Sequence, residues 1–485
     1  MSNLPGQVFR FRDPGLGVAE LSGATFLFIG ASERGETNVV RAISSPAAIV
    51  DEYGQGPLSE AAALALDVAG GPVYLCRVPG TVPGATGPVT AKPLTASTGT
   101  LAAAGEALTR FDAAVEITRT GTLGEAEFRY SLDGERTWSE PRTVPLGGTY
   151  LVPESGVTLT FTPGAGPLFL ELGDKFTFET TAPHYSTTEL AGAIAALRTY
   201  FQGAPDFTLD AIVLTGTNET GSEAATVFGA LDVHLTSLEA IYRYVGGIMD
   251  AGSADTRAAV KTAFASVASR RISVVYGEQV CATSKAFAGF GAPRTPLLNS
   301  VAARAGRVVV STDLARFADG PLPGVLAITH DEFVTEEMDA AKFTTARTWA
   351  GVAGFYLTNA RMKSPVGSDY LYWQHRRVMD VASRVTYAAQ QQFVSAEFRT
   401  NPDGSIDERE AVIVEETVRE ALEQALLIPK NASGRAGQVT AIDYAVDRAA
   451  NITSTQILPT TVAVQPLAYA KRLSTEIGFA LNVTA

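Results

Sequence analysis

The chain has 485 residues and a formal net charge of −13, with 46% hydrophobic and 18% charged residues. This length corresponds to roughly two to four domains, and the negative charge argues against nucleic acid or an anionic membrane as the main partner. No stretch approaches the roughly 18 apolar residues of a membrane span, and the first residues lack the apolar core of a signal peptide. We therefore expect a soluble protein made in a cytoplasm.

The first part of the chain predicts an extended arm followed by an α/β unit. Prolines and glycines exclude a helix from residues 1–20. The apolar runs at 24–32 and 72–78 predict buried strands, and helices are expected over 44–54 and 59–71, the second capped by Ser59 and stopped by the glycines that follow it. Continuous apolar strands separated by helices predict a covered, at least partly parallel sheet.

Residues 90–183 have a different texture, because polar and apolar residues alternate and turns are frequent. A hairpin is expected with Asp133 and Gly134 at its turn. Phe128, Tyr130 and Trp138 are its expected core or cross-strand aromatic residues. This pattern predicts an all-β domain inserted into the α/β one.

The α/β pattern then returns and gives way to long helices. Ser186 and Glu189 predict a capping box at the start of a helix. Strands are expected over 209–216, 270–277 and 306–312, and helices over 369–393, 407–429 and 441–452. The predicted fold class is therefore an α/β body with an inserted all-β domain and a C-terminal α+β domain. The predicted parts are an N-terminal arm (1–20), a middle domain (21–89 and 184–359), an outer β domain (90–183), an inner domain (360–458) and a C-terminal strand arm (459–485).

Candidate chemical groups favour a protein without catalytic, metal or cofactor sites, and so not an enzyme. Gly30 and Gly35 have P-loop spacing, but Glu36 stands where a phosphate-binding lysine belongs. The four histidines fall in separate segments without metal-ligand spacing. Cys281 has Lys285 nearby, which would lower a thiol pKa, yet core packing is the better interpretation; Cys76 is likewise expected to pack as a small apolar residue. The acidic pair Glu415–Glu416 is interpreted as a solvated helix face.

The C-terminus has a period-two pattern typical of a strand with one apolar face. Its apolar-face residues are Leu473, Thr475, Ile477, Phe479, Leu481 and Val483. The N-terminal arm contributes Val8, Phe9 and Phe11. These terminal segments either fold back onto the chain's own sheet or add to a sheet of a neighbouring copy.

Several short motifs, taken in order, resemble contractile phage tail sheath proteins and their relatives in contractile injection systems. They are "PGQVFRFRDPG", "ATFLFIGASERGETN", "LSEAAALALDVAGGPVYLCRV" and "ILPTTVAVQPLAYAKRLSTEIGFAL". The insertion with "FRYSLDGERTWS" is similar to the outer decoration domain of larger phage sheaths.

The resemblance implies a structural subunit that polymerises helically around an inner tail tube and contracts to drive that tube through a cell envelope. It implies many copies joined by exchanged terminal strands, with tail tube, baseplate and tail terminator proteins as partners, and neither nucleic acid nor a membrane. The location would be the virion, after assembly in a host bacterial cytoplasm. The helix expected at 441–452 would face the tube through Arg448. The alternatives are another self-assembling virion component, such as a tail tube or capsid protein, and an α/β enzyme with an accessory β domain.

Overall fold

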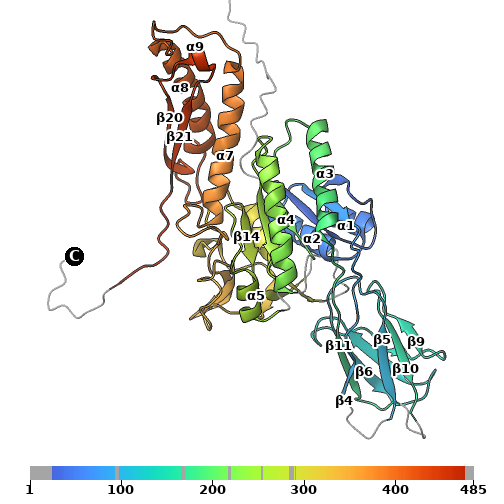
Figure 1. Ribbon diagram of the computed structural model, residues 1–485. Helices are drawn as coiled ribbons and strands as arrows, with labels where there is room; N and C mark the ends of the chain where they lie inside the picture. The colour runs from blue at the N-terminus through green and yellow to red at the C-terminus, as the bar shows by residue number, and fades with distance from the viewer. Residues whose placement is uncertain are drawn as a thin grey trace, which may run out of the picture.

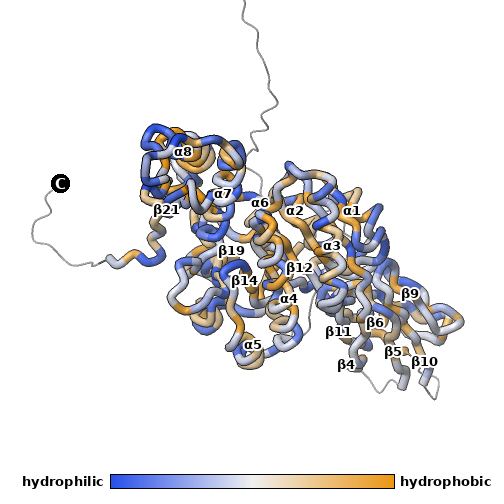
Figure 2. Tube along the Cα trace, turned by 45° about the horizontal axis from the view of Figure 1, so that its top comes forward, coloured by the Kyte–Doolittle hydropathy of each residue, from blue (hydrophilic) through white to orange (hydrophobic). Residues whose placement is uncertain are grey.

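The computed structural model shows three lobes arranged in a row (Figure 1). It describes residues 25–92, 98–164, 170–216, 220–252, 255–282, 289 and 291–475. An α/β body lies in the middle, a lobe of β-strands projects from one end, and a lobe of helices and two strands stands at the other. The hydrophobic residues are concentrated within these lobes, notably along the helices of the body (Figure 2).

The centre of the body is a six-stranded sheet with the strand order β14-β13-β12-β1-β3-β2. Its strands are β1 (Phe26–Ala31), β2 (Val40–Ile43), β3 (Val73–Val78), β12 (Ala211–Leu214), β13 (Gly246–Asp250) and β14 (Ile272–Val275). Neighbouring strands are parallel, except that β2 is antiparallel to β3. Every residue of β1, β12, β13 and β14 is buried. The covered, largely parallel sheet is therefore confirmed.

Two layers of helices cover this sheet. They are α1 (Pro46–Tyr53), α2 (Pro57–Ala69) and α6 (Leu298–Arg307) in one core, and α3 (Thr187–Gly203), α4 (Gly221–Glu239) and α5 (Arg257–Ala263) in the other. Because side chains alternate along a strand, Phe28 packs in the first core and Ile29 in the second. Full burial of one such side chain contributes roughly 1.5–3 kcal/mol.

The helix ends confirm one predicted cap and correct another. The capping box of Ser186 and Glu189 is present at the start of α3. The expectation for Ser59 is wrong, because Ser59 is buried inside α2, which begins at Pro57. Proline suits this first helical position since its missing N–H would have no partner there. The helix ends at Ala69, and the capping residue Gly70, with a φ of 69°, fits the predicted glycine stop.

The strand expected at 306–312 is also wrong. Residues up to Arg307 belong to α6, and a turn follows. Val308 and Val310 pack against two different apolar clusters. Their preference for strands is therefore overridden by tertiary packing, as often happens with β-branched residues.

The rest of the body consists of smaller antiparallel sheets. A three-stranded sheet contains β15 (Glu278–Cys281), β16 (Arg294–Pro296) and β17 (Val325–Ile328). A hairpin contains β18 (Ala346–Trp349) and β19 (Val352–Leu357), and a short helix, η2 (Phe317–Asp319), precedes β17.

The projecting lobe is an antiparallel β structure of two sheets, with orders β4-β11-β6-β7-β8 and β5-β10-β9. The strands are β4 (Thr90–Lys92), β5 (Thr100–Ala104), β6 (Asp112–Arg119), β7 (Glu127–Ser131), β8 (Arg142–Thr143), β9 (Thr149–Leu151), β10 (Thr158–Thr162) and β11 (Lys175–Glu179). Phe128 is fully buried and contacts Tyr150 and Phe161. Asp133 is also fully buried, and its carboxylate accepts the N–H of Ala292 at 3.1 Å, which joins this lobe to the body.

The remaining lobe, which we call the C-terminal lobe, consists of helices packed on a two-stranded sheet. Its elements are α7 (Trp373–Gln390), η3 (Gln391–Phe393), α8 (Glu408–Leu422), the π-helical turn η4 (Glu423–Leu427), β20 (Val439–Val446), α9 (Ile452–Thr455) and β21 (Thr460–Pro466). The helix expected over 441–452 is wrong, since residues 441–446 belong to β20 and a turn follows them. Ile442, Tyr444 and Val446 also alternate, and pairing with β21 makes use of that alternation.

Among the described residues, no helix is long and apolar enough to cross a membrane.

Candidate functional site

The candidate site is the sheet of β20 and β21 together with the chain that leaves it. One face of the sheet packs on α7 and α8 through Tyr444, Val446 and their half-buried neighbours. The other face exposes small and polar residues such as Ala441, Asp443 and Ala463. A two-stranded sheet is marginal on its own, so the helices beneath it stabilise this one.

The hydrogen-bond pattern shows which main-chain groups point away from the sheet. Asp447 N–H donates to the carbonyl of Pro459 at 2.9 Å, so this pair is hydrogen-bonded across the ladder. Hydrogen-bonded and non-bonded pairs alternate along antiparallel strands. The register pairs Tyr444 with Val462 and Ile442 with Val464, and the N–H and C=O groups of these residues therefore face the two outer edges.

Among the described residues, no strand pairs with the outer edge of β21. None of the described residues forms a hydrogen bond with the outward main-chain groups of Val462 or Val464. Unpaired strand edges present N–H and C=O groups to any incoming strand. This edge therefore has the geometry required for strand addition.

Polar side chains occupy the outer edge of β20 instead. Glu415 Oε1 accepts the N–H of Val446 at 2.8 Å, and Arg419 donates to the carbonyl of Tyr444 at 3.3 Å. Arg448 binds both carboxylate oxygens of Glu415, at 2.7 and 2.9 Å, and also pairs with Glu408. The hydrogen bond from Arg448 holds the pKa of Glu415 below its usual value. We call Glu408, Glu415, Arg419 and Arg448 the edge cluster.

The chain that follows β21 returns to the body before it departs. The Tyr469 hydroxyl donates to the carbonyl of Ser311 at 2.6 Å, and burial raises the pKa of Tyr469 well above its usual value. Lys471 pairs with Asp313 and lies 4.3 Å from the ring centre of Tyr372. From residue 472 the described chain is exposed and leaves the body (Figure 1).

The predicted site residues are only partly within the described chain. Leu473 is 88% exposed, Thr475 is exposed, and neither belongs to a strand in this single subunit. Arg448 lies in the turn after β20, where its guanidinium is already bound to two carboxylates. The remaining predicted arm residues lie outside the described residues: Val8, Phe9, Phe11, Ile477, Phe479, Leu481 and Val483.

The sequence interpretation missed the polar partners of β20. Glu415 is buried, whereas Glu416 is exposed, so only one of the two belongs to a solvated helix face. A signal was available, because Glu415 lies next to the stripe formed by Ala411, Val414 and Val418 on the buried face of α8. A carboxylate on such a face requires a buried partner.

The groups considered for chemistry are engaged in structural contacts. Cys76 and Cys281 are free and buried, and burial raises the pKa of Cys281 to about 11, so its thiol is not activated. Glu36 pairs with Arg41 at 2.6 Å at the turn with P-loop spacing. No cluster of three metal-ligating side chains occurs among the described residues.

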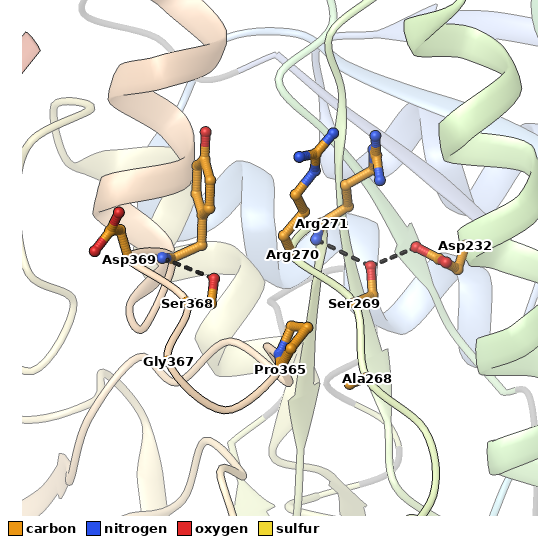
Figure 3. A pocket seen from close by; sticks show the side chains of 10 residues that line it. Asp232, Ala268, Ser269, Arg270, Arg271, Pro365, Gly367, Ser368 and Asp369 are labelled. Atoms are coloured by element: carbon orange, nitrogen blue, oxygen red, sulfur yellow. Dashed lines mark hydrogen bonds between the residues drawn. The ribbon is translucent and has the colours of Figure 1, made fainter. Parts of the chain in front are cut away.

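A polar cavity of about 450 Å³ lies between the loop 268–271 and the loop 365–370 (Figure 3). Asp232 accepts a hydrogen bond from Ser269, whose hydroxyl also accepts the N–H of Arg271. Arg270 and Arg271 both pair with Glu239. The two arginines of this cavity thus already have a carboxylate partner in the same chain.

Comparisons with known proteins agree with this architecture. A family model described as "DUF2586, N-terminal domain" matches residues 7–361. The helical sheath of the anti-feeding prophage (AFP) in its contracted state is 13% identical with a TM-score of 0.51, covering 99% of this chain and 100% of that one.

Two further solved structures are similar over the same extent. A chain of the AFP baseplate is 14% identical with a TM-score of 0.51, covering 99% of this chain and 100% of that one. The contracted PVC sheath complex of an extracellular contractile injection system is 11% identical with a TM-score of 0.51, covering 99% of each chain. A comparison with curated protein sequences found no match.

The resemblance expected from the sequence motifs is thereby confirmed at the level of the fold. The chain belongs to the DUF2586 family and has the fold of the sheath proteins of contractile injection systems.

Proposed function

We propose that this chain is the sheath subunit of a contractile tail or injection system. Many copies polymerise helically around an inner tube, and the assembly contracts to drive the tube through a target envelope. The proposal rests on two features of one fold. The edge of β21 has no partner among the described residues, and the C-terminal segment is exposed where it departs from the body. The fold is shared with a sheath protein over 99% of the chain.

Subunits would be joined by strand addition. The terminal segment of one copy pairs with the edge of β21 in another, so that main-chain hydrogen bonds provide affinity and alternating side chains fix the register. One joint is weak, because a cross-strand pair contributes roughly 0.2–1 kcal/mol. Many joints in a helical assembly act together and hold firmly.

The lobes would have separate places in the tube. Residues 360–458, with the arm 1–20, form the inner domain around the tube, residues 21–89 and 184–359 form the middle domain, and residues 90–183 project outward. Tail tube, baseplate and terminator proteins are the proposed partners, in a particle assembled in a bacterial cytoplasm. Contraction needs no nucleotide, because the energy lies in the difference between two packings of one sequence.

Electron microscopy of two purified chains tests the proposal. One chain is complete, and the other ends at Arg472, which retains the contacts of Tyr469 and Lys471 with the body. We expect hollow ringed tubes from the complete chain and monomers from the shortened one. Compact particles from both chains at high concentration would overturn the sheath assignment. Tubes from both would overturn the role of the terminal strand.

A further inference from the structure

The two edges of the β20–β21 sheet differ in the state of their hydrogen-bonding groups. On β21, the outward groups of Val462 and Val464 have no partner among the described residues. On β20, the outward N–H of Val446 and the carbonyls of Tyr444 and Val446 are bound by Glu415, Arg419 and Arg448 respectively. Among the described residues, the edge of β21 is therefore open at Val462 and Val464, whereas the edge of β20 is occupied at Val446 and at the Tyr444 carbonyl but not at Ile442.

The occupied edge is built from well-fixed groups. The Glu415 side chain is 10% exposed, and both of its oxygens are bound by Arg448. Arg448 is in turn fixed by Glu408 at 2.6 and 3.0 Å. Such bidentate, charge-assisted contacts are stronger and more directional than neutral hydrogen bonds.

An incoming strand cannot pair fully with β20 while these contacts persist. Strand addition needs the Val446 N–H as a donor and the Tyr444 carbonyl as an acceptor. The N–H has a single proton, which Glu415 already binds. The side chains of Glu415 and Arg448 also fill the space in which the new main chain would lie.

We propose that the edge cluster blocks strand addition at β20 in the free subunit, so that a terminal segment from a second copy joins β21 first, and a further terminal segment joins β20 only after Glu415 and Arg448 move away. This order rests on the proposed sheath function. It makes assembly stepwise, because the second joint requires displacement of contacts that the first does not. Side chains that cover a strand edge are a known means of preventing unwanted strand pairing.

The first test measures hydrogen bonding at the outer edge of β20 in the absence of assembly. Amide hydrogen exchange of Val446 is followed at a concentration where the complete chain is monomeric. Glu415→Ala removes the acceptor, and we expect exchange to be about tenfold faster, a factor that corresponds to 1.4 kcal/mol. Glu416→Ala is the matched control, because the neighbouring glutamate is exposed and the charge change is the same. Equal exchange rates of the Val446 amide in both variants would contradict the proposal that Glu415 occupies this edge.

The second test measures assembly of the same complete chains by light scattering, with electron microscopy to identify tubes. We expect the critical concentration of Glu415→Ala to be about tenfold lower than that of the unchanged chain, and Glu416→Ala to be unaffected. An unchanged or higher critical concentration for a folded Glu415→Ala chain would overturn the block.

Two observations keep the outcomes separate. Absence of tubes from the unchanged chain under all conditions contradicts the sheath function itself, whereas tubes with equal critical concentrations contradict only the block. If Glu415→Ala melts at a markedly lower temperature, Glu415→Gln replaces it, because the amide keeps the size of the side chain but loses the charge that holds Arg448. A critical concentration for Glu415→Gln equal to that of the unchanged chain would then overturn the block.

Discussion

Arg384 of α7 donates a hydrogen bond to Oδ1 of Asp210 at 2.6 Å, and so fastens the C-terminal lobe to the residue that precedes β12 in the body. The same guanidinium binds the carbonyls of Leu209 and Tyr244. About two turns earlier on α7, the buried Arg377 donates to the carbonyls of Ala305 and Val308. Helix α7 is therefore tied to the body at both Arg377 and Arg384.

This relationship predicts a loss of stability when Arg384 is replaced. Arg384→Ala leaves the carboxylate of Asp210, whose side chain is 16% exposed, without its cation. We expect the free energy of unfolding of the C-terminal lobe to fall by about 2 kcal/mol, the usual scale for a hydrogen bond to a charged group. Urea unfolding followed by peptide-resolved hydrogen exchange measures this. Arg409→Ala, at an exposed site on α8, is the control, and an equal effect at both sites would contradict the prediction.

The open edge of β21 predicts a selective effect of proline. Val462→Pro removes an outward N–H while the ladder to β20 is retained, since the non-bonded pair of Val462 and Tyr444 uses no such bond. We expect the variant to fold and to form no tubes in electron micrographs. Val462→Ala loses the same packing but keeps the N–H, and we expect it to assemble. Tubes from the proline variant would show that this edge is not the strand acceptor.

The anchoring of the chain after β21 predicts a change in proteolysis. Tyr469→Phe removes the hydroxyl that binds the Ser311 carbonyl, at a cost of roughly 1 kcal/mol. We expect trypsin to cut after Lys471 and Arg472 about fivefold faster in the monomeric chain, because local opening is more frequent. Tyr387→Phe, at an exposed tyrosine of α7, is the control. Unchanged cleavage would mean that the hydroxyl does not hold this segment.

Glu332 predicts a specific dependence of stability on pH. Burial alone would raise its pKa, but hydrogen bonds from His330 and from the N–H groups of Asp339 and Glu337 hold the pKa below the ordinary value of 4.5. A carboxylate with a lowered folded-state pKa stabilises the fold above its unfolded pKa and loses that contribution as the pH falls through the folded value.

We therefore expect the difference in unfolding free energy between the unchanged chain and Glu332→Gln to be constant above about pH 5 and to shrink as the pH is lowered further. Denaturant titrations at a series of pH values measure it. Glu336→Gln, an adjacent acidic site for which no such contacts occur among the described residues, is the control. A difference that stays constant down to pH 3 would contradict the assignment.

The body was predictable because its buried strands are short, continuous apolar runs, which are typical of a sheet covered on both faces. Leu27 and Ile29 leave the strand on one side and Phe26 and Phe28 on the other, which requires helices on both faces. The run containing Val308 and Val310 looks the same in isolation, but it follows a helix whose last turn ends at Arg307. Local pattern alone does not distinguish these cases.

The position of Glu415 on the buried face of α8 gave a signal of burial, but its partner Arg448 was not predictable from the sequence. Glu415 and Arg448 are 33 residues apart, and their contact depends on β20 being a strand, whereas Ile442, Ala445 and Val446 also have helical spacing. The segment forms a strand and not a helix because β21 pairs with it, and the spacing of apolar residues does not reveal this long-range interaction. Arg448 was assigned toward an inner tube, and that role stays a prediction.

The anchoring of Tyr469 and Lys471 to Ser311 and Asp313 has a mechanical consequence. The departing segment begins at a point fixed to the residues that follow α6, beyond the sheet of β20 and β21. A tilt of the subunit therefore also moves the point at which its C-terminal segment departs. In an assembly where that segment pairs with a neighbouring copy, rotation of one copy therefore exerts a pulling force on the neighbour through the segment.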